Sequence, residues 1–179
     1  MKGVIIYKGK YGATQQYAEW LSKELRLPLL SPENLTASNL RLDDFIIIGS
    51  SVYMGRLLLK KWLKKNADIL QNKKVFFFIV CGTPPTQNEK LEVIAKNNIP
   101  AILKHSAIYF FQGKMKSSKL SWMDRFALKM GAMLEKNPVT KKEMLQDFDA
   151  VKKENINALV NAVKVFSLVK REAIHSQIL

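Results

Sequence analysis

Apolar and polar positions form alternating blocks along the chain that predict strands and helices in turn. Continuous apolar, β-branched runs are typical of strands buried in a parallel sheet. They predict strands at residues 3–7, 45–49, 75–81 and 107–111, and a weaker one at 28–30. Between them, apolar residues at helical spacing predict helices at 13–25, 57–70, 88–97 and 147–170. The alternation predicts an α/β fold, a doubly wound five-stranded parallel sheet with helices on both faces.

The loop after the first predicted strand indicates the order of the strands. It contains glycine and has the features of a phosphate-binding loop, and five strands with such a loop after the first suggest the order 2-1-3-4-5. In that order a ligand binds at the switch point between the first and third strands. The 179 residues show no repeat and no linker. We therefore expect a single domain over 1–179, with an insertion at about 113–138.

The segment between the first strand and the first helix has the features of a phosphate-binding loop. It reads Lys8, Gly9, Lys10, Tyr11, Gly12, Ala13 and Thr14. Backbone N–H groups at a helix start point toward an anion, and the helix dipole favours its charge. The loop matches neither GxxxxGK[ST] nor GxGxxG, which disfavours ATP, GTP and classical NAD ligands. The alternative is an ordinary strand-to-helix turn that binds no phosphate.

Two further loops should lie beside this one, because parallel strands end at the same edge of a sheet. Both are rich in small polar residues, and Tyr53 supplies an aromatic ring that can stack on a planar ligand. The alternative for Tyr53 is a surface aromatic, and for Cys81 a packing role. The candidate ligand-binding residues of these loops are Ser50, Ser51, Val52, Tyr53, Met54, Gly55, Cys81, Gly82 and Thr83.

The formal net charge of +14 indicates attraction to polyanions. These include nucleic acid, an anionic membrane face, an acidic protein and a small molecule with several carboxylates. We find no helix-turn-helix, RNA-recognition or zinc-finger pattern, which disfavours nucleic acid. One cysteine and two histidines exclude an internal disulfide framework and make a metal site unexpected.

The apolar runs are too short to cross a bilayer, and residues 1–8 do not resemble a signal peptide. We therefore expect a cytoplasmic protein.

The segment after the last strand predicts a basic amphipathic helix. Ser121 and Asp124 fit a capping box at its start, and Met123, Phe126 and Met130 then share one face. Such a helix can contact a membrane surface or cover a large apolar substrate. Alternatively, it packs against the sheet and leaves its lysines in solvent. The candidates for substrate or membrane contact are Lys114, Lys116, Lys119, Trp122 and Arg125.

The loop containing Gly12 and Thr14, in this strand order, resembles the flavodoxin superfamily. The FMN-phosphate loop of that family is hydroxylated and contains glycine, and the order 2-1-3-4-5 is the flavodoxin-like one. Gly9, Tyr11 and Ala13 depart from the family pattern, because they replace two usual hydroxyls and one usual polar residue. The resemblance implies FMN as the cofactor.

Four stretches are similar to the menaquinone-dependent protoporphyrinogen oxidase family, a flavodoxin-like branch. They are residues 7–14, 44–55, 62–67 and 121–126. The resemblance implies oxidation of protoporphyrinogen IX, a carboxylate-bearing tetrapyrrole of heme biosynthesis, with electrons passing to a membrane quinone. It also implies that Ser50, Ser51 and Tyr53 lie beside the isoalloxazine ring, and that the protein makes peripheral contact with the inner face of an anionic membrane.

Two other functions remain open on the sequence alone. One is a flavodoxin-type FMN electron-transfer protein, although ordinary carriers of that type are acidic and this chain is basic. The other is a flavin-free module whose basic surface binds an acidic partner, which the departures at Gly9, Tyr11 and Ala13 keep open. The sequence assigns no catalytic acid or base, and a flavin enzyme does not strictly need one. It also leaves the oligomeric state unassigned.

Overall fold

The computed structural model describes residues 2–35 and 40–175. Its strands are β1 (Gly3–Lys8), β2 (Leu29–Leu30), β3 (Phe45–Tyr53), β4 (Arg56–Leu57), β5 (Lys74–Cys81), β6 (Ala107–Gln112), β7 (Lys114–Met115) and β8 (Phe148–Asp149). Its α-helices are α1 (Ala13–Leu25), α3 (Lys60–Leu70), α4 (Asn88–Asn98), α5 (Trp122–Leu134), α6 (Pro138–Leu145) and α7 (Asn157–His175). Short 3-10 turns lie at Pro32–Asn34, Ala101–Leu103, Ser117–Lys119 and Lys153–Ile156.

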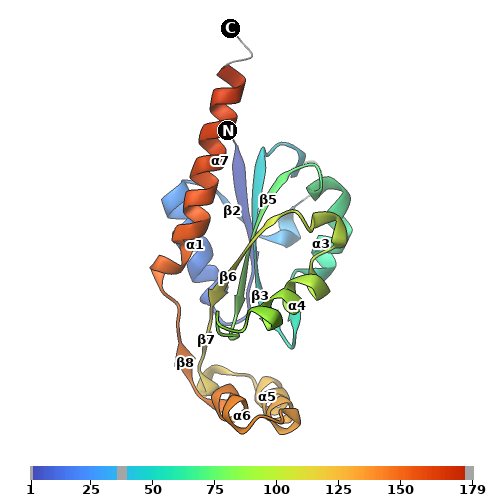
Figure 1. Ribbon diagram of the computed structural model, residues 1–179, viewed down its shortest axis with the longest axis vertical. Coiled ribbons are helices and arrows are strands. Elements are labelled where there is room, and N and C mark those ends of the chain that lie inside the picture. The colour runs from blue at the N-terminus through green and yellow to red at the C-terminus, as the bar shows by residue number, and fades with distance from the viewer. Residues whose placement is uncertain (1, 36–39, 176–179) are drawn as a thin grey trace.

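The central sheet has the predicted order. Five parallel strands run β2-β1-β3-β5-β6, which is the expected 2-1-3-4-5 once the short hairpin strand β4 is set aside. Helices α1 and α7 cover one face of the sheet, and α3 and α4 cover the other (Figure 1). The prediction of a doubly wound α/β fold is therefore confirmed.

Both faces of the sheet are buried, which explains the continuous apolar runs of its strands. Ile5, Ile47 and Phe78 pack toward α1 and α7. Their neighbours Ile46 and Phe77 pack toward α3 and α4, because successive side chains of a strand point to opposite faces. The core thus fixes the parallel strands in register, and their carboxyl ends meet at one edge.

The third strand is longer than predicted. We expected it to end at Gly49 and be followed by a loop, but β3 continues to Tyr53 and pairs with β4 through a two-residue turn at Met54 and Gly55. Both turn residues have positive φ, at 49° and 71°, as the tight turns of hairpins require. The predicted start of the next helix at residue 57 is wrong for the same reason, since α3 begins at Lys60.

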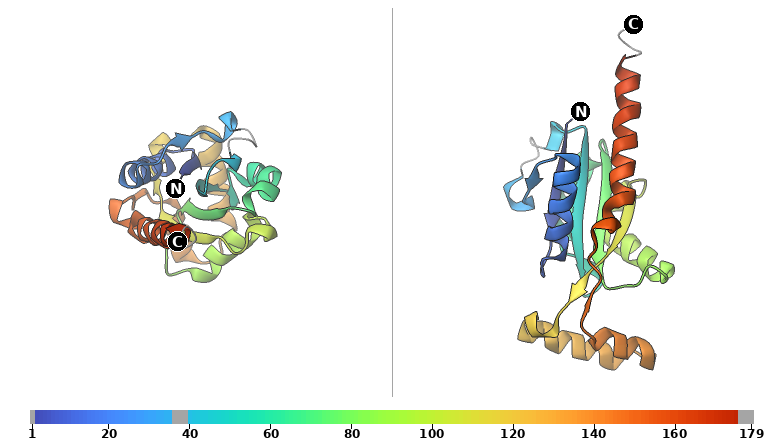
Figure 2. Two further views of the ribbon diagram at one scale, coloured as in Figure 1. Left: turned by 90° about the horizontal axis from the view of Figure 1, so that it is seen from above. Right: turned by 90° about the vertical axis from the view of Figure 1, so that its left-hand side faces the viewer.

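The helix predicted at 147–170 is wrong at its start. Residues 148–149 form β8, which pairs antiparallel with β7, and α7 begins only at Asn157. Residues 114–149, which we call the excursion, therefore leave and rejoin the core through two paired strands. The structural excursion extends beyond the predicted insertion boundary at 138, because α6 follows α5. Figures 1 and 2 show α5 and α6 beyond the carboxyl edge of the sheet.

The apolar face of α5 is exposed rather than packed against the sheet. The side chains of Trp122, Phe126 and Leu134 are 76%, 63% and 79% exposed. The alternative interpretation that this helix packs against the sheet is therefore wrong. Only Asp124 and Ala132 of α5 are buried.

Candidate functional site

The loop between β1 and α1 has the shape of an anion-binding loop. Gly12 precedes α1 with a left-handed φ of 82°, which suits glycine. A Cβ at Gly9 would lie 2.7 Å from the Cβ of Thr14, so the loop folds closely over that side chain. The first N–H groups of α1 have no acceptor within the helix, as at every helix start. Two of them belong to Ala13 and Thr14, which line a cavity.

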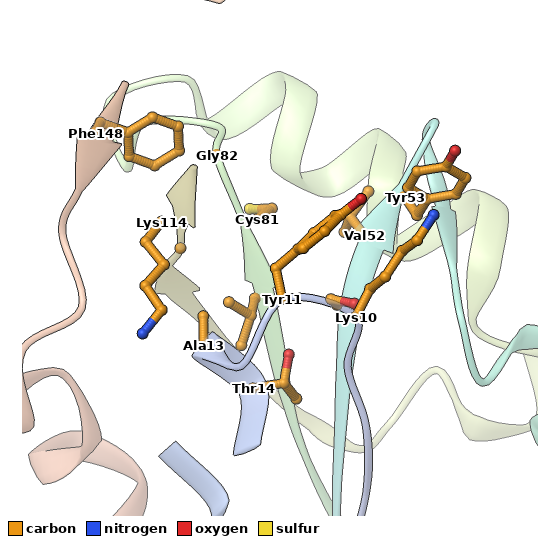
Figure 3. Close-up of a pocket in the computed structure, with 13 residues that line it drawn as sticks. Lys10, Tyr11, Ala13, Thr14, Val52, Tyr53, Cys81, Gly82, Lys114 and Phe148 are labelled. Carbon is orange, nitrogen blue, oxygen red and sulfur yellow. The ribbon is translucent and has the colours of Figure 1, made fainter. Parts of the chain in front are cut away.

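This cavity opens at the carboxyl edge of the sheet. It encloses about 460 Å³, including space open to solvent. In Figure 3, Phe148 and Lys114 lie on one side of it and Lys10 and Tyr53 on the other. The complete lining is Lys10, Tyr11, Ala13, Thr14, Ser51, Val52, Tyr53, Val80, Cys81, Gly82, Gly113, Lys114 and Phe148.

Three buried hydroxyls of the lining point to a polar ligand. Tyr11 Oη, Thr14 Oγ1 and Ser51 Oγ have no hydrogen-bond partner in the part of the chain that the structure describes. Buried polar groups are nearly always hydrogen-bonded, and one left unpaired costs about 1–3 kcal/mol. A ligand with several oxygen or nitrogen atoms in the cavity would satisfy all three. The donor set fits a phosphorylated, hydroxylated cofactor.

The Tyr53 ring is held at the rim of the cavity by two charged groups. Its hydroxyl donates to Oδ1 of Asp124, and the ammonium of Lys10 lies 4.1 Å from its ring centroid. Lys10 Nζ is 2.8 Å from Oδ1 and 2.7 Å from Oδ2 of Asp124. The hydrogen bond to Asp124 is the main cause that raises the pKa of Lys10 above its ordinary value.

Cys81 lies in the cavity wall as a buried thiol. Its Sγ is 3.9 Å from the carbonyl oxygen of Thr83, and burial raises the pKa of the thiol. The protonated form is therefore favoured at neutral pH, which suits packing rather than nucleophilic chemistry. The Thr83 carbonyl also accepts from Nε2 of Gln112 at 2.8 Å, so Thr83 connects the end of β5 to the end of β6.

The other predicted ligand-binding residues lie outside the lining. Lys8 pairs with Glu33 at 2.5 Å, and this contact lowers the pKa of Glu33 to about 2. Ser50 is buried, and its hydroxyl oxygen accepts from Leu59 N–H at 3.2 Å. Gly9 and Gly12 shape the first loop. Met54 and Gly55 form the exposed hairpin turn.

Of the basic and aromatic candidates in the excursion, Lys114 reaches the cavity. Its Nζ lies 3.1 Å from Oε1 of Gln16. The others lie outside the lining, with their side chains exposed: Lys116, Lys119, Trp122 and Arg125.

Sequence reasoning missed three residues of the cavity wall and the carboxylate behind its rim. Val80 and Gly113 line the wall from the ends of β5 and β6, and Phe148 lines it from β8. Phe148 lies in a segment whose apolar spacing predicts a helix, so the sequence does not place it in the cavity wall. The sequence predicts only a capping role for Asp124, and its backbone N–H does donate to Ser121 Oγ at 3.2 Å. No group of three or more His, Cys, Asp or Glu side chains within the described ranges suits a metal ion.

Comparisons with known proteins agree with this geometry. A family model described as a flavodoxin domain matches residues 4–143. No match was found among curated proteins.

Three similar solved structures come from bacteria. The Trp repressor binding protein from Bacillus subtilis is 15% identical, with 63% of this chain and 85% of that chain covered and a TM-score of 0.48. A WrbA-like flavodoxin from Agrobacterium tumefaciens is 21% identical, with 69% and 87% covered and a TM-score of 0.45. Oxidised flavodoxin 1 from Bacillus cereus is 17% identical, with 71% and 91% covered and a TM-score of 0.40.

The resemblance to the flavodoxin superfamily is therefore confirmed, while the finer resemblance to protoporphyrinogen oxidases stays a prediction. The family model spans most of the chain, including β1, the first loop and the ends of β3 and β5. The strand order of the sheet and the position of the cavity at its switch point are those of this fold. The chain belongs to the flavodoxin domain family.

Proposed function

We propose that the protein is an FMN-dependent oxidoreductase. The observation that carries this proposal is the set of three unpartnered hydroxyls on Tyr11, Thr14 and Ser51, gathered around one cavity at the switch point of the sheet. FMN carries a phosphate, a polyhydroxyl chain and a planar ring with polar edges. These groups match the loop, the hydroxyls and the aromatic rim of the cavity.

Each part of the cavity has a role in holding the cofactor. Thr14 Oγ1 and the N–H groups at the start of α1 would bind the phosphate, because a helix start favours an anion. Ser51 and Tyr11 would hydrogen-bond the ribityl chain or the ring edge. The Tyr53 ring would contact the isoalloxazine. When bound, FMN supplies the transfer of hydride or single electrons, and the protein supplies position and electrostatics.

As the substrate we propose protoporphyrinogen IX, with a membrane quinone as electron acceptor. The proposal follows from the similarity of residues 7–14, 44–55, 62–67 and 121–126 to that oxidase family. The cationic character of the chain supports it, since lysine and arginine attract the propionate groups of a tetrapyrrole. Lys114 lines the cavity and is the cation that we assign to this contact, since Lys10, the other lysine of the lining, is paired with Asp124.

Flavin titration and anaerobic turnover test the proposed function. We expect the purified protein to shift the visible bands of FMN at micromolar concentration. The loaded protein should then oxidise protoporphyrinogen IX and reduce a water-soluble menaquinone analogue. Binding without turnover, together with one-electron exchange with a ferredoxin, would support the electron-transfer alternative. No flavin binding would leave the flavin-free binding module.

We further propose that α5 contacts an anionic membrane from the cytoplasmic side. Its exposed apolar side chains are Trp122, Met123, Phe126, Met130, Met133 and Leu134. Exposed cations lie in and around the same helix, at Lys116, Lys119, Arg125, Lys129 and Lys136. An apolar face with nearby cations is typical of helices that lie in the headgroup region of anionic lipids. Within the described ranges, we find no helix whose length and hydropathy suit a bilayer span.

Phe126→Glu tests this membrane contact. The substitution places a negative charge in the centre of the exposed apolar face of α5. We expect co-flotation with phosphatidylglycerol vesicles to fall at least tenfold, because a charge at a lipid-facing position is costly and is repelled by anionic headgroups. Val165→Glu is the matched control, since Val165 is equally exposed but lies on α7. Equal flotation of wild type and F126E would rule out the contact.

A further inference from the structure

A buried carboxylate joins the excursion to the rim of the cavity. Asp124 lies in the first turn of α5, and its side chain is 5% exposed. Its partners come from core segments far away in the sequence, Lys10 from the β1–α1 loop and Tyr53 from the end of β3. A carboxylate is rarely buried this deeply unless it is paired and hydrogen-bonded.

The three side chains hold one another in place. The Asp124 carboxylate accepts from the Tyr53 hydroxyl and lies within 2.8 Å of Lys10 Nζ through both oxygens. The same ammonium lies over the Tyr53 ring. Every member of the cluster therefore contacts the other two, and moving any one of them breaks two contacts. Charge-assisted hydrogen bonds of this kind are about twice as strong as neutral ones.

Both partners of Asp124 line the cavity, while Asp124 itself lies behind them. We propose that Asp124 is a positioning residue of this site, which fixes the Tyr53 ring and the Lys10 ammonium at its rim. The excursion is then a component of the ligand site rather than an appendage. This inference rests on the proposed function, because the ring that Tyr53 contacts is that of the bound flavin.

The cluster also decides which group binds the phosphate. Asp124 neutralises the ammonium of Lys10 and holds it beside Tyr53, so the phosphate is left to Thr14 and the N–H groups of the first loop. Asp124→Asn keeps the shape of the side chain and an acceptor for the Tyr53 hydroxyl. It removes the charge that holds Lys10, which frees the ammonium and loosens the ring.

Hydrogen exchange in the flavin-free protein provides the first readout. We expect backbone amides of residues 50–56 and 9–14 to exchange about tenfold faster in D124N than in the wild type, since local opening is easier when a charge-assisted contact is lost. Asp147→Asn is the matched control. Asp147 is an exposed residue of the excursion that accepts from Ser117, outside the cavity lining.

Binding of riboflavin and FMN provides the second readout. Riboflavin has the ring and the ribityl chain but no phosphate, so its binding excludes any attraction between Lys10 and the phosphate. We expect its dissociation constant to rise about fivefold in D124N, because the Tyr53 ring is loosened. FMN affinity should fall less and depend more steeply on salt, because the freed Lys10 ammonium attracts the phosphate. A purely structural role of Asp124 would weaken both ligands equally.

The outcomes separate this inference from the proposed function. If the wild type binds flavin while D124N matches it in exchange and in riboflavin affinity, the positioning role is overturned and the proposed function stands. If the wild type binds no flavin, the proposed function fails and the role toward flavin fails with it. If D124N does not fold, the double variant K10Q/D124N takes its place, because it removes the charge of Lys10 together with that of its partner. We expect it to show the same faster exchange, and unchanged exchange would overturn the inference.

Discussion

Replacing Thr14 with valine is expected to stabilise the free protein and to weaken its binding of FMN at least tenfold. Thr14 is 1% exposed, and its hydroxyl has no partner among the residues that the structure describes. Valine has the same shape without the unpaired hydroxyl, so the free energy of unfolding should rise by about 1 kcal/mol. A hydrogen bond to a charged acceptor contributes about 1.5–3 kcal/mol, which corresponds to at least a tenfold loss of affinity for the phosphate.

Thermal unfolding and flavin titration measure the two effects of T14V separately. Riboflavin lacks the phosphate, so its affinity should not change. Thr14→Ser keeps the hydroxyl and is the matched control, and it should retain most of the FMN affinity. A T14V protein that binds FMN as tightly as the wild type would show that the phosphate lies elsewhere.

Among the variants that replace a glycine of this sheet with alanine, Gly49→Ala is expected to lose the most stability. Gly49 lies in β3 beside Phe78 of β5. A Cβ at Gly49 would lie 1.9 Å from Cζ of Phe78. That ring cannot move away, because it is fully buried and stacked on Phe111 at 5.5 Å. Overpacking of this kind costs about 3 kcal/mol or more, a large part of a typical domain's stability.

Urea denaturation measures the stability of G49A against a control variant in which a glycine with open space around it is replaced. Gly131→Ala adds the same methyl group in α5, where the nearest atom is Met144 Cε at 3.6 Å. We expect that variant to be neutral or slightly stabilising, since alanine favours a helix over glycine by about 1 kcal/mol. Adding Phe78→Leu to G49A should recover part of the loss. Equal unfolding midpoints for G49A and wild type would contradict the packing argument.

The parallel sheet could be predicted because its strands are buried on both faces. Residues 75–81 form one continuous apolar run, a pattern typical of a strand buried on both faces. The errors arose at 57 and 147, where apolar residues follow polar ones at helical spacing but tertiary pairing decides the structure. Leu57 is held by β3 and Phe148 by β7, and neither partner is visible in local sequence.

The candidate site could be predicted in part for a topological reason. Carboxyl ends of parallel strands meet at one edge, so Thr14, Ser51 and Gly82, which lie near the ends of β1, β3 and β5, had to converge once the strand order was known. The contributions of Phe148 and Asp124 could not be predicted in this way. They depend on how the excursion folds back on the core, and Asp124 contacts residues 71 and 114 positions away.

The pairing of β7 with β8 at the base of the excursion has a consequence for how this protein can change in evolution. Ala150 N–H donates to the Gly113 carbonyl at 3.1 Å, so the two points where the excursion joins the core are adjacent. A segment whose ends meet can be shortened, lengthened or exchanged for another without moving any strand of the parallel sheet. The length and sequence of this segment can therefore change while the parallel strands stay in place, provided that Lys114 and Phe148 still line the cavity and Asp124 still contacts Lys10 and Tyr53.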